Sequence, residues 1–295
     1  MAASSVTPSS LLLQPFADYG FMRRALVATL ALSMGSAPIG TLLVLRRMSL
    51  MGDAMGHALL PGAALGFIVA GFSLSAMSAG GFIAALAVAL AAGYVTRVTA
   101  QREDASFAAF YLIALALGVM LVSTHGSSVD LMHLLFGTIL AVDDAALLLM
   151  ASVASLTLVA LAVLYRPLIV ECLDPGFLRN VGGRGHLVHG AFLVLTVANL
   201  VAGFQALGTL MAVVLMMLPA TAARFWTGEV WSLALVAGGI SVLSGFAGLL
   251  LSFHAQWPSG PAIVLVAGAA YLFSLLAGPH DGLLWRLGRR SHRTV

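Results

Sequence analysis

Lysine is absent from the sequence, cysteine occurs once, and charged residues make up only 8% of the 295 positions. Without lysine the chain can form neither the phosphate-binding loop G-x-x-x-x-G-K-[ST] nor a Schiff base, so it does not hydrolyse nucleotides by itself. The lone Cys172 cannot form an internal disulfide. Because soluble domains carry about 25% charged residues, this composition excludes a soluble enzyme, a nucleic-acid-binding protein and a disordered chain.

Hydrophobic residues make up 61% of the sequence, and its mean hydropathy is +1.04. A membrane-spanning helix needs about 20 apolar residues, and several long apolar runs meet or approach this length. They cover residues 25–45, 54–72, 79–96, 106–123, 145–165, 187–203, 206–223, 230–252 and 261–278. The pattern predicts an all-α protein, a polytopic transmembrane bundle of eight or nine helices that forms one integral membrane domain.

The least regular of these runs lies between residues 46 and 72. Asp53 and His57 interrupt its hydrophobicity. Helix-disrupting residues interrupt it at Gly52, Gly56, Pro61, Gly62 and Gly66. Irregular backbone at membrane depth is tolerated only where protein or a water-filled cavity surrounds it. We therefore expect this stretch to be a broken helix that lines a pore.

Most arginines lie in connections that fall on one side of the predicted membrane. These segments are 97–104, 166–186, 224–229 and 286–295. The intervening connections 124–144 and 253–260 contain none. By the positive-inside rule, the arginine-containing segments and the C-terminus face the cytoplasm. The sequence thus predicts a multi-pass protein of the cytoplasmic (inner) membrane.

The two ends of the chain are expected to lie outside the helical bundle. Residues 1–20 lack a clean signal-peptide pattern and are expected to form a short interfacial segment. Residues 21–280 are expected to form the membrane domain, and residues 281–295 a basic cytoplasmic tail. Arginine pairs flank both ends of the first apolar run, so the side of the N-terminus, and with it the choice between eight and nine helices, stays open.

Asp53 and His57 are the candidate functional residues of the irregular run. Four residues apart on a helix, they share one face with Cβ atoms about 5–6 Å apart, and an ionisable residue in a spanning segment is by default a functional-site hypothesis. A carboxylate with an imidazole suits Zn²⁺, Mn²⁺ or Fe²⁺, whereas Ca²⁺ and Mg²⁺ prefer oxygen ligands alone. The alternative is a buried pair in which the two side chains satisfy each other by hydrogen bonding.

Met48, Met51 and Met55 form a second pattern in the same stretch, at spacings of three and four residues. A methionine stripe can bind Cu(I). At about 100° per residue, however, these side chains project away from Asp53 and His57. We therefore expect the three methionines to pack in the core of the protein.

The longest predicted cytoplasmic connection covers residues 171–186. Asp174 followed by Pro175 is typical of a helix N-cap with proline at the first helical position. Gly182 and Gly183 would end such a helix after about two turns. This short helix at the membrane surface is either a docking element for a cytoplasmic partner or an ordinary connector.

The predicted outer connection contains His125, Asp130 and His133. These side chains could receive a metal or a docking protein, or they could form the solvated face of a helix. The sequence contains neither H-E-x-x-H nor G-x-S-x-G, so nothing in it indicates an intramembrane protease or esterase.

The run from Leu45 to Gly62, LRRMSLMGDAMGHALLPG, resembles the signature of the metal-importing ABC permeases, the ABC-3 family, which serve zinc, manganese and iron. The resemblance covers about residues 16–278, nearly the whole chain. Its weaker blocks are residues 134–137, 174–177, 208–211, 218–222 and 258–264.

The resemblance implies a permease that dimerises, binds two copies of a separate cytoplasmic ATP-binding cassette ATPase and receives metal from an extracytoplasmic metal-binding protein. It places the family's metal-coordinating pair on Asp53 and His57, and the cytoplasmic coupling helix on about residues 174–185. The implied ATPase-coupling residues are Asp174, Pro175, Phe177, Arg179 and Gly182. Leu178, where the family often has alanine, and the double glycine at 182–183 depart from the usual pattern and bear on the register of the coupling contacts.

Two ligands per chain cannot complete the coordination sphere of zinc or manganese. A two-fold dimer would bring two copies of Asp53 and two of His57 together on its axis. Together with the resemblance, this implies the permease subunit of an ATP-driven importer that passes a zinc, manganese or iron ion through a pore at a homodimer interface. We expect the chain itself to be no enzyme, to hold no permanent cofactor, and to contact membrane lipid but not nucleic acid.

Two other classes of function stay open at this stage. One is a secondary metal transporter that works without ATP, and the other is an intramembrane metal-dependent enzyme. The ligand types do not choose among zinc, manganese and iron, because carboxylate and imidazole serve all three metals.

Overall fold

The computed structural model describes residues 8–71, 73–125, 142–173, 185–280 and 282–285. Every regular element among these residues is an α-helix, which confirms the predicted fold class. In chain order the helices are α1 (Pro8–Asp18), α2 (Gly20–Leu45), α3 (Ser49–Ala70), α4 (Leu74–Val98), α5 (Glu103–His125), α7 (Asp144–Leu173), α9 (Gly185–Leu207), α10 (Thr209–Ala223), α11 (Val230–Ala255) and α12 (Ser259–Ala277).

Within the described ranges, eight helices are long and apolar enough to cross a membrane, so the chain is an integral multi-pass membrane protein. The ninth predicted run corresponds to α10, an apolar helix of 15 residues that is shorter than the other candidates. The expected runs and the observed helices agree in order and position. This agreement follows from the length of uninterrupted apolar sequence that a bilayer requires.

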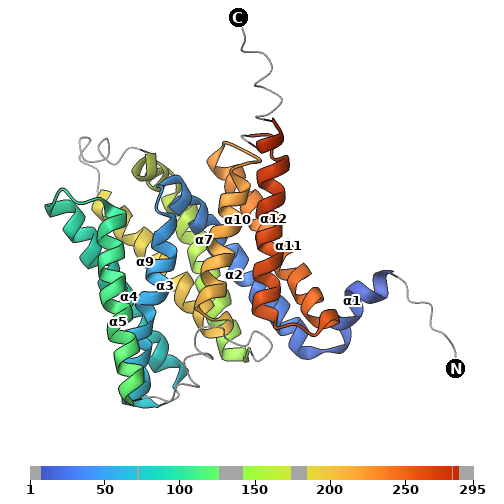
Figure 1. Ribbon diagram of the computed structural model, residues 1–295, viewed down its shortest axis with the longest axis horizontal. Helices are drawn as coiled ribbons and strands as arrows, with labels where there is room; N and C mark the ends of the chain where they lie inside the picture. Colours follow the sequence, from blue (N-terminus) through green and yellow to red (C-terminus); the bar gives the residue numbers. More distant parts are fainter. Residues whose placement is uncertain (1–7, 72, 126–141, 174–184, 281, 286–295) are drawn as a thin grey trace, which may run out of the picture.

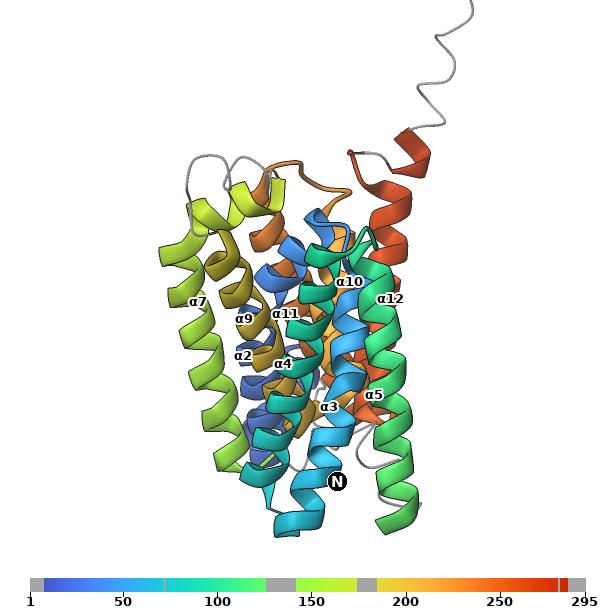
Figure 2. The same ribbon diagram turned by 90° about the vertical axis from the view of Figure 1, so that its left-hand side faces the viewer.

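Successive helices run in alternating directions, so their ends gather at two faces of the bundle (Figure 1). The ends of α2, α4 and α7 and the starts of α3, α5 and α9 lie at the same end of the bundle as the end of α12. Figure 2 shows α4 between α9 and α3, and α4 packs against both of these helices. The connection before α3 and the one between α7 and α9 therefore share one end of the molecule.

Helix α3 is continuous from Ser49 to Ala70, so the predicted break inside the stretch 46–72 is wrong. Its glycines bring neighbouring helices close instead. A Cβ atom added at Gly62 would collide with the backbone of Gly80 in α4. Pro61 stays inside the helix and lies against Gly118 of α5, where an added Cβ atom would be 3.0 Å from the proline nitrogen.

Two residues with positive φ lie in short turns between helices. Arg47, in the turn between α2 and α3, has a φ of 58°, which is unusual for a residue with a side chain. Gly208, with a φ of 82°, separates α9 from α10. The first of these turns fixes where α3, with its two candidate ligands, begins.

Candidate metal site

Asp53 and His57 lie on one face of α3, as their spacing predicts. The Oδ1 atom of Asp53 is 3.5 Å from the Nε2 atom of His57. This distance exceeds the 2.7–3.2 Å typical of N–H···O hydrogen bonds. The side chains are 57% and 29% exposed, respectively, so the alternative of a buried pair that satisfies itself does not describe them.

The imidazole of His57 packs near an aromatic ring and is partly exposed. Its ring lies 5.8 Å from the ring of Tyr111 in α5, tilted by 31°. The Nδ1 atom is buried, and no hydrogen-bond partner for it lies among the described residues. Because Nε2 is the nitrogen that faces the Asp53 carboxylate, it is the atom placed to share a ligand with that carboxylate.

The opposite side of α3 is packed into the protein interior. Met48, Met51 and Met55 are at most 3% exposed and belong to the main hydrophobic core, as expected for a packing role. Gly56 faces α10, where an added Cβ atom would lie 2.9 Å from Cγ2 of Val213. The face of α3 that carries these methionines and Gly56 thus packs against neighbouring helices, whereas the face that carries Asp53 is uncovered in the single chain.

A single chain supplies only part of a coordination sphere at this position. Among the described residues no group of three or more His, Cys, Asp or Glu side chains converges to hold a metal ion. Asp53 and His57 are the third and seventh residues of the candidate span Met51–Ala70. At 1.5 Å per residue, His57 lies about 9 Å along the helix from the start of that span. The described residues therefore give Asp53 and His57 two candidate ligand groups at this position, and their role in metal binding stays a prediction.

The other predicted site residues lie outside the described residues. These are the coupling residues Asp174, Pro175, Phe177, Arg179 and Gly182. Asp130 and His133 of the predicted outer connection lie outside them as well. The roles assigned to these side chains remain predictions.

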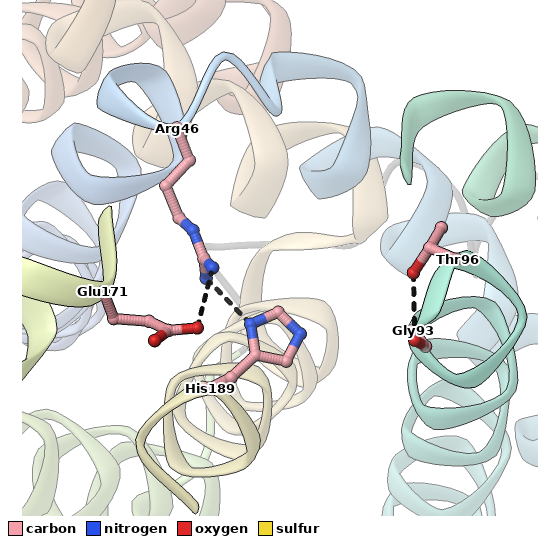
Figure 3. Close-up of polar contacts among 5 residues, drawn as sticks. All are labelled: Arg46, Gly93, Thr96, Glu171 and His189. Carbon is pink, nitrogen blue, oxygen red and sulfur yellow. Dashed lines mark hydrogen bonds and ion pairs between the residues drawn. The ribbon is translucent and has the colours of Figure 1, made fainter. Parts of the chain in front are cut away.

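A buried polar cluster that sequence reasoning missed lies at the ends of three helices (Figure 3). Arg46 follows α2, Glu171 lies near the end of α7, and His189 lies in the first turns of α9. The Nη1 atom of Arg46 is 2.9 Å from Nδ1 of His189, and its Nη2 atom is 3.6 Å from Oε1 of Glu171. The available signal was the presence of a glutamate and a histidine at the edges of apolar runs.

Residues 18–278 match a known family, the ABC 3 transport family. This chain belongs to the ABC 3 transport family. The match covers the same region as the resemblance of the α2–α3 sequence and confirms it. In this family member, the irregular run that contains Asp53 and His57 forms the continuous helix α3.

This ABC 3 family member is similar to two curated relatives and to one solved structure whose names describe what those proteins do. It is 31% identical over 263 residues to the manganese import system permease protein ScaB of Streptococcus parasanguinis, covering 89% of this chain and 92% of the relative. It is also 31% identical over 267 residues to the chelated iron transport system membrane protein YfeD of Yersinia pestis, covering 90% and 88%. The solved structure of PsaBC from Streptococcus pneumoniae in complex with Fab superposes with a TM-score of 0.82 at 27% identity, covering 95% of this chain and 99% of that one.

Proposed function

We propose that this chain is the permease subunit of an ATP-driven importer of a divalent transition-metal ion, with manganese as the first candidate substrate. The exposed half-site at Asp53 and His57 carries the proposal, because a carboxylate with an imidazole suits such ions. The names of the two relatives support the transport of a metal, since one is a manganese import permease and the other belongs to an iron transport system.

The exposure of Asp53 argues for a second copy of the chain. An ionisable side chain within a membrane-spanning segment is unfavourable when it faces lipid, and 57% of the Asp53 side chain is uncovered in the single chain. A two-fold axis next to α3 would cover it and bring two carboxylates and two imidazoles together. In this arrangement the ion crosses at the dimer interface and is held by four side chains.

The proposed topology places the arginine-containing end of the bundle in the cytoplasm. The end of α12, the end of α7 and the start of α9 share this end (Figure 1), and the positive-inside rule assigns it to the cytoplasm of a cell with this protein in its inner membrane. The ATPase would dock there on residues 174–185. The extracytoplasmic metal-binding protein would deliver the ion at the opposite face, residues 1–20 would lie at the membrane interface, and residues 281–295 would form a cytoplasmic tail.

The choice of metal is tested by competition. A strain that lacks its own metal importers is complemented with this chain, its ATPase and its binding protein, and uptake of labelled manganese is measured against unlabelled manganese, iron and zinc. Manganese is expected to compete best. If zinc displaces the label at lower concentration than manganese does, the substrate assignment is wrong, although the transport function stands.

The site itself is tested with Asp53→Ala and His57→Ala. Both variants are expected to lose metal uptake and to keep their assembly with the ATPase, because the side chains are exposed and contribute little to packing. Asp104→Ala is a matched control, since it removes a carboxylate at the start of α5. Wild-type uptake in both site variants would exclude this route for the ion.

The coupling segment is tested with Arg179→Glu. Reversing this charge is expected to weaken association with the ATPase, measured by co-purification, whereas the metal affinity stays at the wild-type value. A companion measurement omits the ATPase. Uptake that persists without it would identify a secondary transporter instead of an ATP-driven importer.

A further inference from the structure

The Arg46 cluster joins the two helices that flank the proposed ATPase-docking segment. Glu171 is the third-last residue of α7, and His189 is the fifth residue of α9. These two partners of Arg46 therefore precede and follow residues 174–184 in the sequence. Arg46 itself comes from a third element, the end of α2. One guanidinium therefore connects both ends of this segment to the turn that precedes α3.

The geometry of the cluster is specific and closed to solvent. The side chains of Arg46 and Glu171 are 8% and 9% exposed, and His189 is also buried. The guanidinium carbon lies 5.4 Å from the centre of the Phe192 ring. Because arginine only donates hydrogen bonds, Nδ1 of His189 must accept. A planar guanidinium can serve an acceptor, a carboxylate and an aromatic face together, whereas a lysine ammonium cannot.

A short, hydrogen-bonded turn connects Arg46 to α3, the helix that carries Asp53 and His57. The amide of Arg47 donates to the carbonyl of Val44 at 3.1 Å, and the amide of Met48 donates to the carbonyl of Leu43 at 2.9 Å. Helix α3 begins at Ser49, immediately after this turn. A displacement of Arg46 would therefore be passed to the start of α3, and Asp53, seven residues after Arg46, lies in the second turn of that helix.

We propose that Arg46, Glu171 and His189 are positioning residues that transmit movement of the α7–α9 connection to α3 and so link ATP hydrolysis to the accessibility of the metal site. This inference rests on the proposed function. Figure 3 shows Arg46 reaching between Glu171 and His189, which is the contact that the movement would have to pull on. None of the three residues touches the ion in this scheme.

The test compares ion transport per ATP hydrolysed in the reconstituted complex of permease, ATPase and binding protein. In Arg46→Gln and Glu171→Gln, the ratio of manganese ions transported to ATP hydrolysed is expected to fall about tenfold, within the range typical of coupling between two sites. Manganese affinity, measured without nucleotide, is expected to stay at the wild-type value. An unchanged ratio in both variants would overturn the inference.

Thr157→Val provides the matched structural control. The hydroxyl of Thr157 in α7 accepts a hydrogen bond from Nδ2 of Asn199 in α9 at 2.7 Å, and both residues are buried. This variant thus removes a polar contact between the same two helices, away from the cluster. It is expected to keep the wild-type ratio. If the transport ratio falls as much in Thr157→Val as in Arg46→Gln, the loss reflects weakened packing between α7 and α9 in general. That result would overturn the proposal.

A pair of substitutions at His189 keeps the test valid if the arginine variant fails to assemble. His189→Gln retains an acceptor for the guanidinium and is expected to keep most of the coupling, whereas His189→Leu removes the acceptor and is expected to lose it. Equal ratios in these two variants would contradict the inference. If wild-type complex shows no ATP-dependent uptake at all, the proposed function fails instead, so the two failures are distinguishable.

Cys172, the single cysteine of the chain, reports on the cluster independently. It follows Glu171 in α7 and is partly buried. In the wild-type complex, its rate of alkylation, followed by mass spectrometry of the permease, is expected to change when the ATPase is trapped in its closed state. The change is expected to disappear in Arg46→Gln. A rate that does not respond to the nucleotide state in the wild type would contradict movement at the cluster.

Discussion

Arg46 and Asp53 are seven residues apart in the chain, yet the first charge is buried and paired whereas the second is largely exposed. Arg46 is buried, contacts Glu171 and His189, and lies over an aromatic ring. Asp53 is more than half exposed, and its nearest basic partner, His57, lies 3.5 Å away with a buried nitrogen that has no partner among the described residues. One region is complete within the chain, and the other is not.

This contrast separates charged groups that pair within the chain from charged groups that the chain leaves uncovered. A buried ion pair must satisfy its hydrogen bonds internally, because uncompensated charge in a low-dielectric interior is strongly unfavourable. A site that releases its ion must instead leave ligand atoms open. In the proposed function, the incomplete pair binds an ion from outside the single chain, whereas the complete cluster contacts its partners within the chain.

The largest expected effect is on stability, and it should appear only in the complete region. Glu171→Ala is expected to lower the free energy of unfolding by about 3–5 kcal/mol, because it leaves the Arg46 charge without its buried carboxylate. Asp53→Ala is expected to change that free energy by less than about 0.5 kcal/mol, as at other exposed positions. Thermal and denaturant unfolding in detergent measures both. Similar losses in the two variants would remove the distinction between the regions.

The next largest effect is on metal binding, and it should appear only in the incomplete region. Asp53→Asn is expected to weaken manganese binding by at least about 100-fold, since even residues that merely support a ligand contribute about 10–100-fold. Glu171→Gln is expected to bind manganese like the wild type. Isothermal titration of the purified permease with manganese checks both values, and tight binding by Asp53→Asn would contradict the assignment of this ligand.

A smaller effect is expected where α3 is pressed against α10. In Gly56→Val, the Cβ atom alone would lie 2.9 Å from Cγ2 of Val213, so the helices must separate at a cost of about 1–3 kcal/mol of stability. Gly238→Val is the control, because nothing lies within 4 Å of a Cβ atom at that position in α11. Comparison of the two unfolding temperatures is the measurement. A loss in the control alone would show that α10 tolerates the displacement.

The smallest effect is expected at the ring that supports His57. Tyr111→Ala removes an aromatic contact 5.8 Å away, and such contacts contribute about 0.5–1.5 kcal/mol. Manganese binding is therefore expected to weaken by about two- to tenfold, whereas Tyr111→Phe should bind like the wild type. If the phenylalanine variant loses as much as the alanine variant, the hydroxyl acts on the site and ring packing does not explain the effect.

The positions of the helices could be predicted from the sequence because a bilayer imposes a minimum apolar length on every crossing. The shared face of Asp53 and His57 followed from the period of the helix, and the burial of Met48, Met51 and Met55 from the same rotation. The family that the signature around these residues implied is confirmed by the match over residues 18–278. Helical periodicity was sufficient for the shared face and for the buried methionines.

Properties that depend on a neighbouring helix could not be predicted. The glycine pattern predicts interruptions at Gly62 and Gly66, whereas in the structure these residues are contact points for α4. The sequence of α3 alone does not distinguish these two uses of glycine. The Arg46 cluster was missed because Arg46 and His189 are 143 positions apart. Arg46 was counted only as a signal of membrane orientation, and its burial became evident from the packing of α2, α7 and α9.

The close approach of Gly62 to Gly80 has a consequence for the speed of transport. Because the two backbones lie close together at these glycines, we expect α3 and α4 to move together. Collective displacements of packed helices take microseconds to milliseconds, far longer than the rotation of a side chain. We therefore expect the movement of this helix pair to limit the rate of transport, and the formation and breaking of bonds between the ion and its ligands to be faster.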